Sequence, residues 1–178
     1  MNEGSVKTFI ELFEKWNRSI NLSAAASRED LLEHITDSLH VVPLLAGAQR
    51  VLDVGSGGGF PVVLAALALP EVQFIALEPI HKKHAFLRTV AREIPVPNLE
   101  PRAERAEDHR DHDYDAAMSR ATFDLAEWLA LGAQFVRPGG KVLGFEAVRR
   151  SDLPPGTERH PYALADKSRA IIVFPVDR

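Results

Sequence analysis

The segment Val51-Leu52-Asp53-Val54-Gly55-Ser56-Gly57-Gly58-Gly59-Phe60 constrains the fold more than any other part of the chain. An apolar run passes directly into a turn with four glycines and then into a helix-forming stretch. Glycine allows the positive φ angles of a tight turn and lets a ligand approach the backbone with no Cβ atom in between. The segment therefore predicts a strand, a tight turn and a helix, the ligand-binding unit of open α/β sheets.

The chain after Arg50 alternates between short apolar runs and longer helical patterns. These patterns predict five strands, at 50–54, 72–77, 98–102, 115–119 and 141–145, and three helices, at 60–69, 80–94 and 125–136. Such alternation predicts a mostly parallel sheet with helices on both faces. Two further apolar runs, 160–164 and 169–174, predict an antiparallel hairpin at the sheet edge.

Two amphipathic helices are expected before this core. The first covers about residues 6–19, where apolar residues recur at helical spacing. The second begins after Ser27, which forms a capping-box pattern with Asp30, and is predicted to run to about Leu45 despite Pro43. We expect a single α/β domain over residues 1–178, with N-terminal helices in 1–46 and a Rossmann-like core in 47–178.

Composition excludes several classes of protein. The 178 residues contain no cysteine, so disulfide frameworks and thiolate metal sites are excluded. No apolar run reaches the roughly 20 residues that cross a bilayer, and the amphipathic N-terminus does not resemble a signal peptide. We therefore expect a cytoplasmic protein that has no membrane segment.

The net charge of −4 argues against nucleic acid only at the scale of the whole chain. Residues 79–92 contain no acid and carry four basic residues, which are candidates for RNA binding: Lys82, Lys83, Arg88 and Arg92. A solvated helix face is the alternative explanation for this charge.

The spacing of the glycines limits the class of ligand that the loop can bind. A dinucleotide fingerprint requires a third glycine where this chain has Phe60, and no Lys-Ser/Thr pair follows as in a P-loop. Glu78 ends the next predicted strand, about 20 residues further on, where a carboxylate can bind ribose hydroxyls. The combination favours a nucleoside cofactor without a pyrophosphate.

Six motifs, in this order, resemble the glucose-inhibited division protein B (RsmG) family. They are Lys15-Trp16-Asn17 with Asn21-Leu22, His34-Ile35-Thr36-Asp37-Ser38, Asp53 to Pro61, Lys82-Lys83 with Phe86-Leu87-Arg88, Ser119-Arg120-Ala121, and Pro138-Gly139-Gly140. The resemblance implies a Rossmann-like class I methyltransferase fold and an S-adenosylmethionine-dependent enzyme that methylates N7 of a guanine in 16S ribosomal RNA. The implied partner is this RNA or the small ribosomal subunit, and we expect a monomer.

The resemblance also implies a set of cofactor-binding residues. These are Asp53, Gly55, Ser56, Gly57, Phe60, Glu78, Ala106, Glu107 and Arg120. Glu78 would hold the ribose, Ala106 and Glu107 would line the adenine, and Arg120 would face the methionine end and the substrate. Because N7 offers a free lone pair, no general base is expected, and Arg120 is assigned an orienting role. A structural salt bridge is the alternative for Arg120.

Three features depart from the family pattern. Val62 replaces a glycine, Glu146-Ala147 replaces Lys-Gly after the fifth core strand, and the chain begins later than is usual. Glu146 and the acidic balance of the chain leave open the alternative that the protein is a methyltransferase for a small molecule. Val62 and the N-terminus keep open a protein that binds S-adenosylmethionine without catalysis.

Two polar groups have an ordinary structural explanation beside a functional one. His34, Asp37 and Ser38 are spaced to share one helix face. They are expected either to form a hydrogen-bonded network that docks the N-terminal helices on the sheet or to form the wall of a pocket. The run from Asp108 to Asp113 contains metal-ligand residue types, but a solvated turn is the favoured interpretation and no metal is expected.

Overall fold

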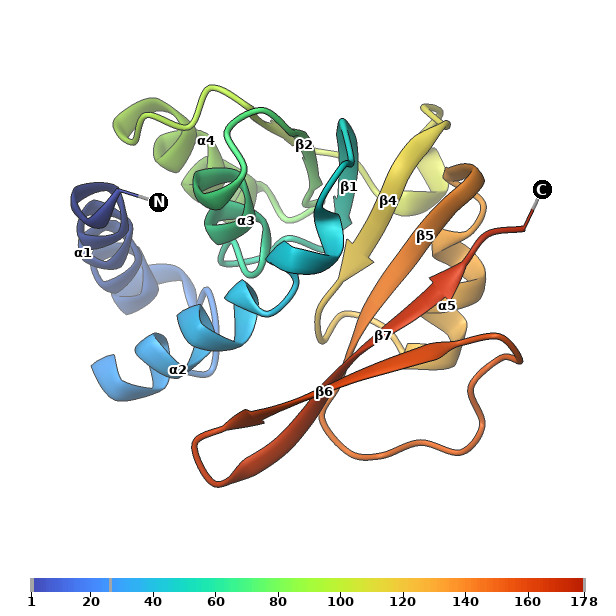
Figure 1. Ribbon diagram of the computed structural model, residues 1–178. Helices are drawn as coiled ribbons and strands as arrows, with labels where there is room; N and C mark the ends of the chain where they lie inside the picture. Colours follow the sequence, from blue (N-terminus) through green and yellow to red (C-terminus); the bar gives the residue numbers. More distant parts are fainter. Residues whose placement is uncertain (1, 26, 178) are drawn as a thin grey trace.

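A seven-stranded sheet forms the centre of the molecule, whose described residues are 2–25 and 27–177 of a computed structural model (Figure 1). The strands are β1 (Arg50–Val54), β2 (Gln73–Leu77), β3 (Leu99–Arg102), β4 (Tyr114–Ser119), β5 (Val136–Glu146), β6 (Glu158–Leu164) and β7 (Lys167–Pro175). Their order is β3-β2-β1-β4-β5-β7-β6. The first five are parallel, and β7 pairs antiparallel with β5 and with β6. This confirms the predicted fold class.

Helices cover both faces of the sheet. They are α1 (Glu3–Ile20), α2 (Arg28–Leu39), η1 (Val42–Leu45), α3 (Val62–Ala68), α4 (His81–Glu93), η2 (Ala106–Asp108) and α5 (Leu125–Gly132). Side chains of α1 to α4 share one buried cluster with Val51 of β1, whereas α5 shares a second cluster with Leu52. Neighbouring residues of a strand point to opposite faces, and β1 therefore carries apolar side chains toward both helical layers.

Two predicted helix ends were wrong. The second helix ends at Leu39 rather than Leu45, and Pro43, which has no N–H to donate, lies in the short 3-10 turn that follows. The predicted helix over 125–136 ends at Gly132, because Phe135 turns into the core and Val136 already belongs to β5. The capping box of Ser27 and Asp30 is confirmed.

The C-terminal hairpin is tighter than predicted. Leu164 pairs with Lys167, so only Ala165 and Asp166 form the turn. Ala165 has a φ of 52°, as turns of this length require. The hairpin extends past the end of β5 and lies near α2 in the fold (Figure 1).

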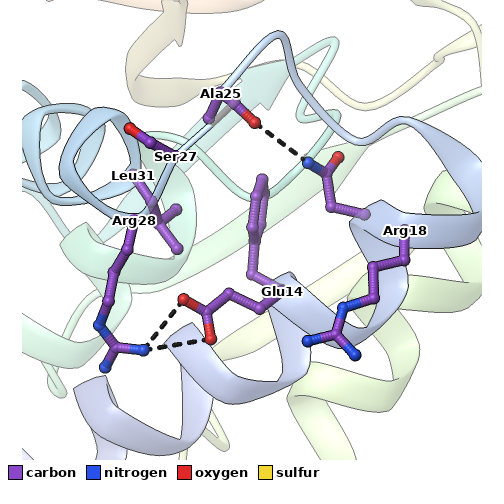
Figure 2. Close-up of a pocket in the computed structure, with 8 residues that line it drawn as sticks. Glu14, Arg18, Ala25, Ser27, Arg28 and Leu31 are labelled. Atoms are coloured by element: carbon purple, nitrogen blue, oxygen red, sulfur yellow. Dashed lines mark hydrogen bonds and ion pairs between the residues drawn. The ribbon is translucent and has the colours of Figure 1, made fainter.

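An aromatic cluster fixes the N-terminal helices over the glycine segment. Phe9 lies with its ring centroid 5.5 Å from that of Phe60, and Phe13 lies 5.4 Å from Phe60. The Arg28 guanidinium also donates to both carboxylate oxygens of Glu14, at 3.0 and 3.1 Å, and so ties the start of α2 to α1 (Figure 2). The two N-terminal helices are therefore held to each other and to the sheet.

We expect Phe9→Ala to lower the free energy of unfolding by about 3–5 kcal/mol, because Phe9 is fully buried and its removal leaves a cavity among the other rings. Leu32→Ala on α2 is the control, since Leu32 is 47% exposed and its loss should cost only about 0.5 kcal/mol. Urea unfolding measures both. Equal costs for the two variants would contradict the packing described.

Candidate functional site

Hydrogen bonds to the end of β2 set the shape of the glycine loop. The amides of Gly55 and Ser56 donate to the carbonyl oxygen of Leu77 at 2.9 and 3.0 Å. The amide of Gly57 donates to Oε2 of Glu78 at 2.7 Å. An anion-binding loop must aim such amides at the ligand, whereas these three are aimed at the sheet. The loop is therefore poorly suited to a pyrophosphate, as its spacing indicated.

Close contacts explain why glycine is needed in this loop. Gly55 has a φ of +74°, and a Cβ atom there would lie 2.4 Å from Oγ1 of Thr122. Thr122 itself donates to the carbonyl oxygen of Gly55 at 3.2 Å. A Cβ on Gly58 would lie 2.8 Å from the Phe13 ring. Thr122 and α1 thus hold the loop from two sides.

A pocket of about 340 Å³ between α1 and α2 (Figure 2) lies apart from the glycines, but a second pocket of about 320 Å³ opens directly on them. We call the second one the glycine-loop pocket. Five predicted cofactor residues line it: Gly55, Ser56, Gly57, Phe60 and Arg120. Its other lining residues are Leu22, Ser23, Ala24, His34, Gly58, Lys83, Ala121 and Thr122. Its volume is at the lower end of the range for small-ligand sites, about 300–1,000 Å³.

Two buried carboxylates accompany the loop. Asp53 is 1% exposed, and its Oδ2 has no hydrogen-bond partner among the described residues. Burial raises the pKa of Asp53 from 3.8 to about 7, against the smaller effects of Ser56 and Arg120. Glu78 is 4% exposed and accepts from the amides of Gly57 and Ile80. Because a carboxylate oxygen has two lone pairs, Glu78 can still accept from ribose hydroxyls.

These features fit S-adenosylmethionine. The amides of Gly55, Ser56 and Gly57 are not free to bind a phosphate, and the Glu78 carboxylate at the base of the loop can accept from hydroxyl donors. Asp53 and Glu78 are buried behind the loop and do not line the glycine-loop pocket, so their contact with the cofactor stays a prediction. Ala106 and Glu107 lie in η2 and are not among the residues that line the glycine-loop pocket. Ala106 is buried beside the α5 core and Glu107 is exposed. Their contact with adenine stays a prediction.

Arg120 joins the N-terminal helices to the sheet. Its Nη1 donates to Oδ2 of Asp37 at 2.8 Å, and its Nη2 donates to Nδ1 of His34 at 3.1 Å. Both side chains of the ion pair are 13% exposed. The Cζ atom of Arg120 lies 5.3 Å from the centroid of the Phe60 ring. Arg120 therefore forms the salt bridge that was the alternative for it and also lines the glycine-loop pocket, while its orienting role stays a prediction.

The contact with Arg120 fixes the state of His34. Because a guanidinium can only donate, Nδ1 of His34 accepts, and the neutral ring carries its proton on Nε2. Burial, with the neighbouring Arg120 charge, lowers the pKa of His34 below 6.5. Ser38, the third residue of the motif, is fully buried and donates to the carbonyl oxygen of His34 at 2.7 Å.

The rest of the Ser119-Arg120-Ala121 motif shapes the turn after β4. Oγ of Ser119 donates to the carbonyl oxygen of Val54 at 2.8 Å, which ties the ends of β4 and β1 together. Ala121 has a φ of 58°, a strained conformation for a residue with a Cβ. Such strain is common at functional sites, and here it turns the chain immediately after Arg120.

Two site residues were missed by the sequence analysis. Tyr162 of β6 donates to Oδ1 of Asp37 at 2.6 Å, 125 positions away in the sequence. Oδ1 of Asn17 accepts from the amides of Leu22 and Ser23 at 2.7 and 3.2 Å, which holds the segment that lines the glycine-loop pocket. Asn17 stood in a motif already noted, whereas no local pattern points to Tyr162.

The basic residues of α4 do not form one site. Lys83 lines the glycine-loop pocket, whereas Arg88 and Arg92 line a groove of about 610 Å³ between α4 and β3. Lys82 is exposed. Nη2 of Arg92 also lies 3.0 Å from Oε1 of Glu93. The four RNA-binding candidates are therefore spread between the pocket, the outer groove and the open surface, and their contact with RNA stays a prediction.

The replacement at Glu146 does not place a negative charge on the surface. Its side chain is 4% exposed and accepts from Nη2 and Nε of Arg159, at 2.6 and 2.8 Å. This fork keeps the pKa of Glu146 below its usual value. Val62 is also fully buried in the core and not at the pocket rim. The two substitutions that favoured other functions are therefore accommodated inside the fold.

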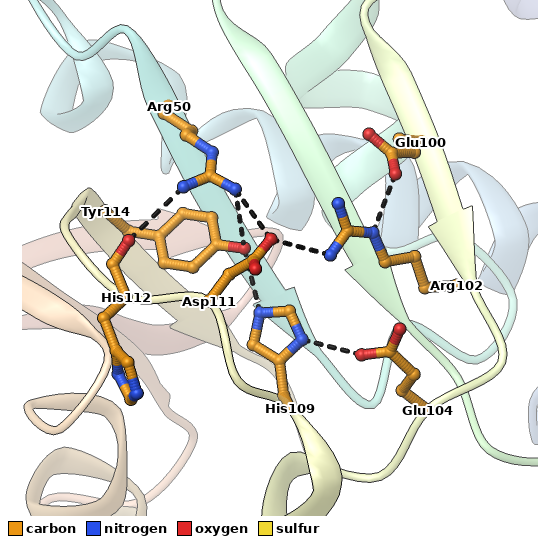
Figure 3. Close-up of polar contacts among 8 residues, drawn as sticks. All are labelled: Arg50, Glu100, Arg102, Glu104, His109, Asp111, His112 and Tyr114. Carbon is orange, nitrogen blue, oxygen red and sulfur yellow. Dashed lines mark hydrogen bonds and ion pairs between the residues drawn. The ribbon is translucent and has the colours of Figure 1, made fainter.

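Most residues of the run from Asp108 to Asp113 are exposed, as a solvated turn predicts, but His109 is buried. His109 is 3% exposed, and its ring contacts Glu104 at 2.7 Å and the Tyr114 hydroxyl at 2.9 Å (Figure 3). Asp111 accepts from Arg50 and Arg102 at 2.9 and 2.8 Å. This network fastens the loop before β4. Among the described residues, no group of three His, Cys, Asp or Glu side chains could hold a metal ion.

The GidB family, described as rRNA small subunit methyltransferase G, matches residues 2–153. The chain belongs to this family. Proteins named ribosomal RNA small subunit methyltransferase G are 37% identical in Chromobacterium violaceum, 39% in Neisseria gonorrhoeae and 35% in an Azoarcus species. The alignments cover 80%, 74% and 93% of this chain and 69%, 64% and 84% of those proteins.

Solved structures share the fold at low sequence identity. An O-methyltransferase from Bacillus cereus in complex with SAH superposes with a TM-score of 0.65 at 17% identity, over 96% of this chain and 91% of that chain. A SAM-dependent methyltransferase from Aquifex aeolicus gives 0.61 at 14% identity, over 82% and 92%. The family assignment confirms the expected enzyme class, a methyltransferase that uses S-adenosylmethionine. No helix in the described parts of the chain is long and apolar enough to cross a membrane.

Asp53→Asn should make stability less dependent on pH in the cofactor-free protein. In the unfolded chain Asp53 loses its proton near pH 3.8, whereas in the folded protein it keeps the proton to about pH 7. The folded state therefore binds more protons in this window, and raising the pH destabilises the wild type. We expect the substitution to remove up to about 4 kcal/mol of this loss between about pH 4 and pH 7, measured by urea unfolding. A stability difference that stays constant with pH would contradict this.

Glu78→Ala should weaken S-adenosylmethionine binding at least about tenfold, because the amides of Gly57 and Ile80 lose their acceptor and the ribose loses its proposed partner. Glu78→Gln keeps one acceptor oxygen, so its affinity for S-adenosylmethionine should lie between those of wild type and Glu78→Ala. Glu71→Ala, in the exposed turn before β2, is the matched control. Calorimetric titration measures the affinities. An unchanged affinity in folded Glu78→Ala would refute the role of Glu78.

Proposed function

We propose that the chain methylates N7 of a guanine in 16S ribosomal RNA, alone or within the small ribosomal subunit. The observation that carries the proposal is Arg120, which lies in the wall of the glycine-loop pocket at the carboxyl ends of β1 and β4. Ligands of open α/β sheets bind at these ends. The names of the relatives, which specify small-subunit rRNA, support the substrate class. The cytoplasm is the proposed compartment, and a monomer the proposed state.

Bound S-adenosylmethionine supplies an electrophilic methyl group, which guanine N7 can accept directly through its lone pair. N7 carries no proton to remove, so the site needs no general base. The residues of this chain then have two tasks. The glycine loop with Asp53 and Glu78 would bind the nucleoside part of the cofactor. Arg120 would orient the methionine end and the base, and such positioning can supply about 7–11 kcal/mol of the barrier.

The hydrogen bonds of Arg120 limit how it can contact the base. Two of the five N–H groups of its guanidinium donate to Asp37 and His34, and the others can donate to the cofactor carboxylate, a phosphate or guanine O6. A bond to N7 would block the lone pair that reacts. Arg120 is therefore assigned to O6, phosphate or carboxylate, and the neutral His34 adds no second positive charge to the site.

Each of the two other functions loses one of the two features that favoured it; the acidic balance and the N-terminus were the other two. A small-molecule substrate was suggested by Glu146, whose charge is paired with Arg159 inside the fold. A protein that only binds the cofactor was suggested by Val62, which packs in the core rather than at the pocket. We therefore keep rRNA methylation as the single proposal.

The test uses small-subunit RNA and 30S particles from cells that lack this modification, with labelled S-adenosylmethionine. We expect one guanine to gain one methyl group, at N7, as shown by mass spectrometry of nucleosides and by chain cleavage at the modified base. Arg120→Ala should lower kcat/KM by at least about 100-fold, because positioning is the main contribution of the site. Cofactor binding with no N7 methylation of either substrate would refute the proposal.

A further inference from the structure

A third pocket lies beside the glycine-loop pocket and shares a wall with it. His34, Arg120 and Ala121 line both. The third pocket has a volume of about 260 Å³, and we call it the hairpin pocket. The rest of its lining comes from α2, the end of β5 and the C-terminal hairpin, and includes Asp37, Glu146, Ala147, Tyr162, Leu164 and Arg169.

The hairpin gives this pocket a fixed, largely apolar wall. Leu164 is 5% exposed, and the ring of Tyr162 is stacked on His40, with a distance of 3.8 Å between the ring centroids. The hydroxyl of Tyr162 is bonded to Asp37, so the ring is held at both its edge and its face. These hairpin residues lie beyond residues 2–153, the part of the chain that the GidB family matches.

A basic hollow adjoins the hairpin pocket on its other side. It has a volume of about 150 Å³ and shares Glu146, Ala147 and Arg169 with the hairpin pocket. Arg149 and Arg159 also line it. Arg159 is engaged by Glu146, whereas Arg149 is exposed, and Nη1 of Arg169 donates to the carbonyl oxygen of Ala147. The hollow thus places positive charge directly beside the hairpin pocket.

We propose that the hairpin pocket binds the acceptor purine and that the basic hollow binds the phosphate of the same nucleotide. This inference rests on the proposed function and adds where its substrate binds. A pocket of this size suits one base rather than a dinucleotide, and aromatic side chains are the usual surface for an RNA base turned out of its stack. The shared wall at Arg120 brings the base next to the methyl donor, as direct transfer requires.

The neighbouring cationic hollow distinguishes a nucleotide from an uncharged ligand. A nucleotide has a flat apolar base and an anionic phosphate a few bonds apart, which matches an apolar pocket joined to a hollow with Arg149 and Arg169. The groove at Arg88 and Arg92 has cations but lies along α4 and β3, apart from Arg120. It would contact RNA backbone and not the reacting base.

The test titrates guanosine monophosphate into the protein saturated with SAH and follows backbone amide signals by NMR. We expect saturable shifts at residues 145–149 and 162–169. Ala147→Trp, which adds a large ring at the shared rim, should weaken binding at least about tenfold, because it fills the space for the nucleotide. Ala163→Trp is the matched control, since Ala163 is also exposed and lines neither cavity.

A comparison of guanosine monophosphate with guanosine tests the proposed phosphate site. Wild-type protein should bind guanosine monophosphate about fivefold tighter than guanosine, and Arg149→Gln should remove this preference, as loss of a charge-assisted hydrogen bond predicts. Shifts confined to the groove of Arg88, no shifts in the hairpin pocket, or equal affinities for the two tryptophan variants would each overturn the proposal.

The two proposals fail differently. If wild-type protein methylates RNA and Ala147→Trp does so at the same rate, the hairpin pocket is not the base site, although the proposed function stands. If guanosine monophosphate binds the hairpin pocket but wild-type protein methylates no guanine in RNA, the proposed function fails and the nucleotide site stands.

Discussion

The ion pair between Arg120 and Asp37 is the contact on which the rest of the site depends. It joins α2 to the turn after β4, across 83 positions of sequence, at a point where both side chains are only 13% exposed. A largely buried charge is stable only with its partner, so neither residue can be lost alone without leaving an unpaired charge in the interior. Because His34 and Tyr162 bond to the same pair, one contact sets the wall between the glycine-loop pocket and the hairpin pocket.

The hydrogen-bond partners of the glycine-loop amides indicate which class of ligand the loop can bind. The amides of Gly55, Ser56 and Gly57 donate to Leu77 and Glu78, so the loop presents a surface on which these three amides are not free to bind a phosphate. That surface suits a nucleoside without phosphates. The aromatic rings of α1, packed on Phe60, keep the surface in place, which gives the N-terminal helices a role in the site as well as in the fold.

Features encoded by neighbouring residues could be predicted, and features set by distant partners could not. Strand β1, the capping box of Ser27 and the glycine turn follow from local patterns, and the structure has all three. The end of α2 at Leu39 and the early start of β5 depend on packing against the sheet, which overrides helical periodicity. The burial of Glu146 could not be predicted because its partner, Arg159, comes from the next strand, and Tyr162 carries no motif that could mark it as part of the site.

We expect Arg120 to act in methyl transfer only in the position that its ion pair with Asp37 gives it. A double-mutant cycle tests it most directly, with kcat/KM for methyl transfer to unmodified small-subunit RNA measured for wild type, Asp37→Asn, Arg120→Gln and the double variant. We predict that the double variant loses no more activity than Arg120→Gln alone, a coupling of at least about 1.5 kcal/mol. Independent roles would instead give losses that add, and additive losses would contradict the account.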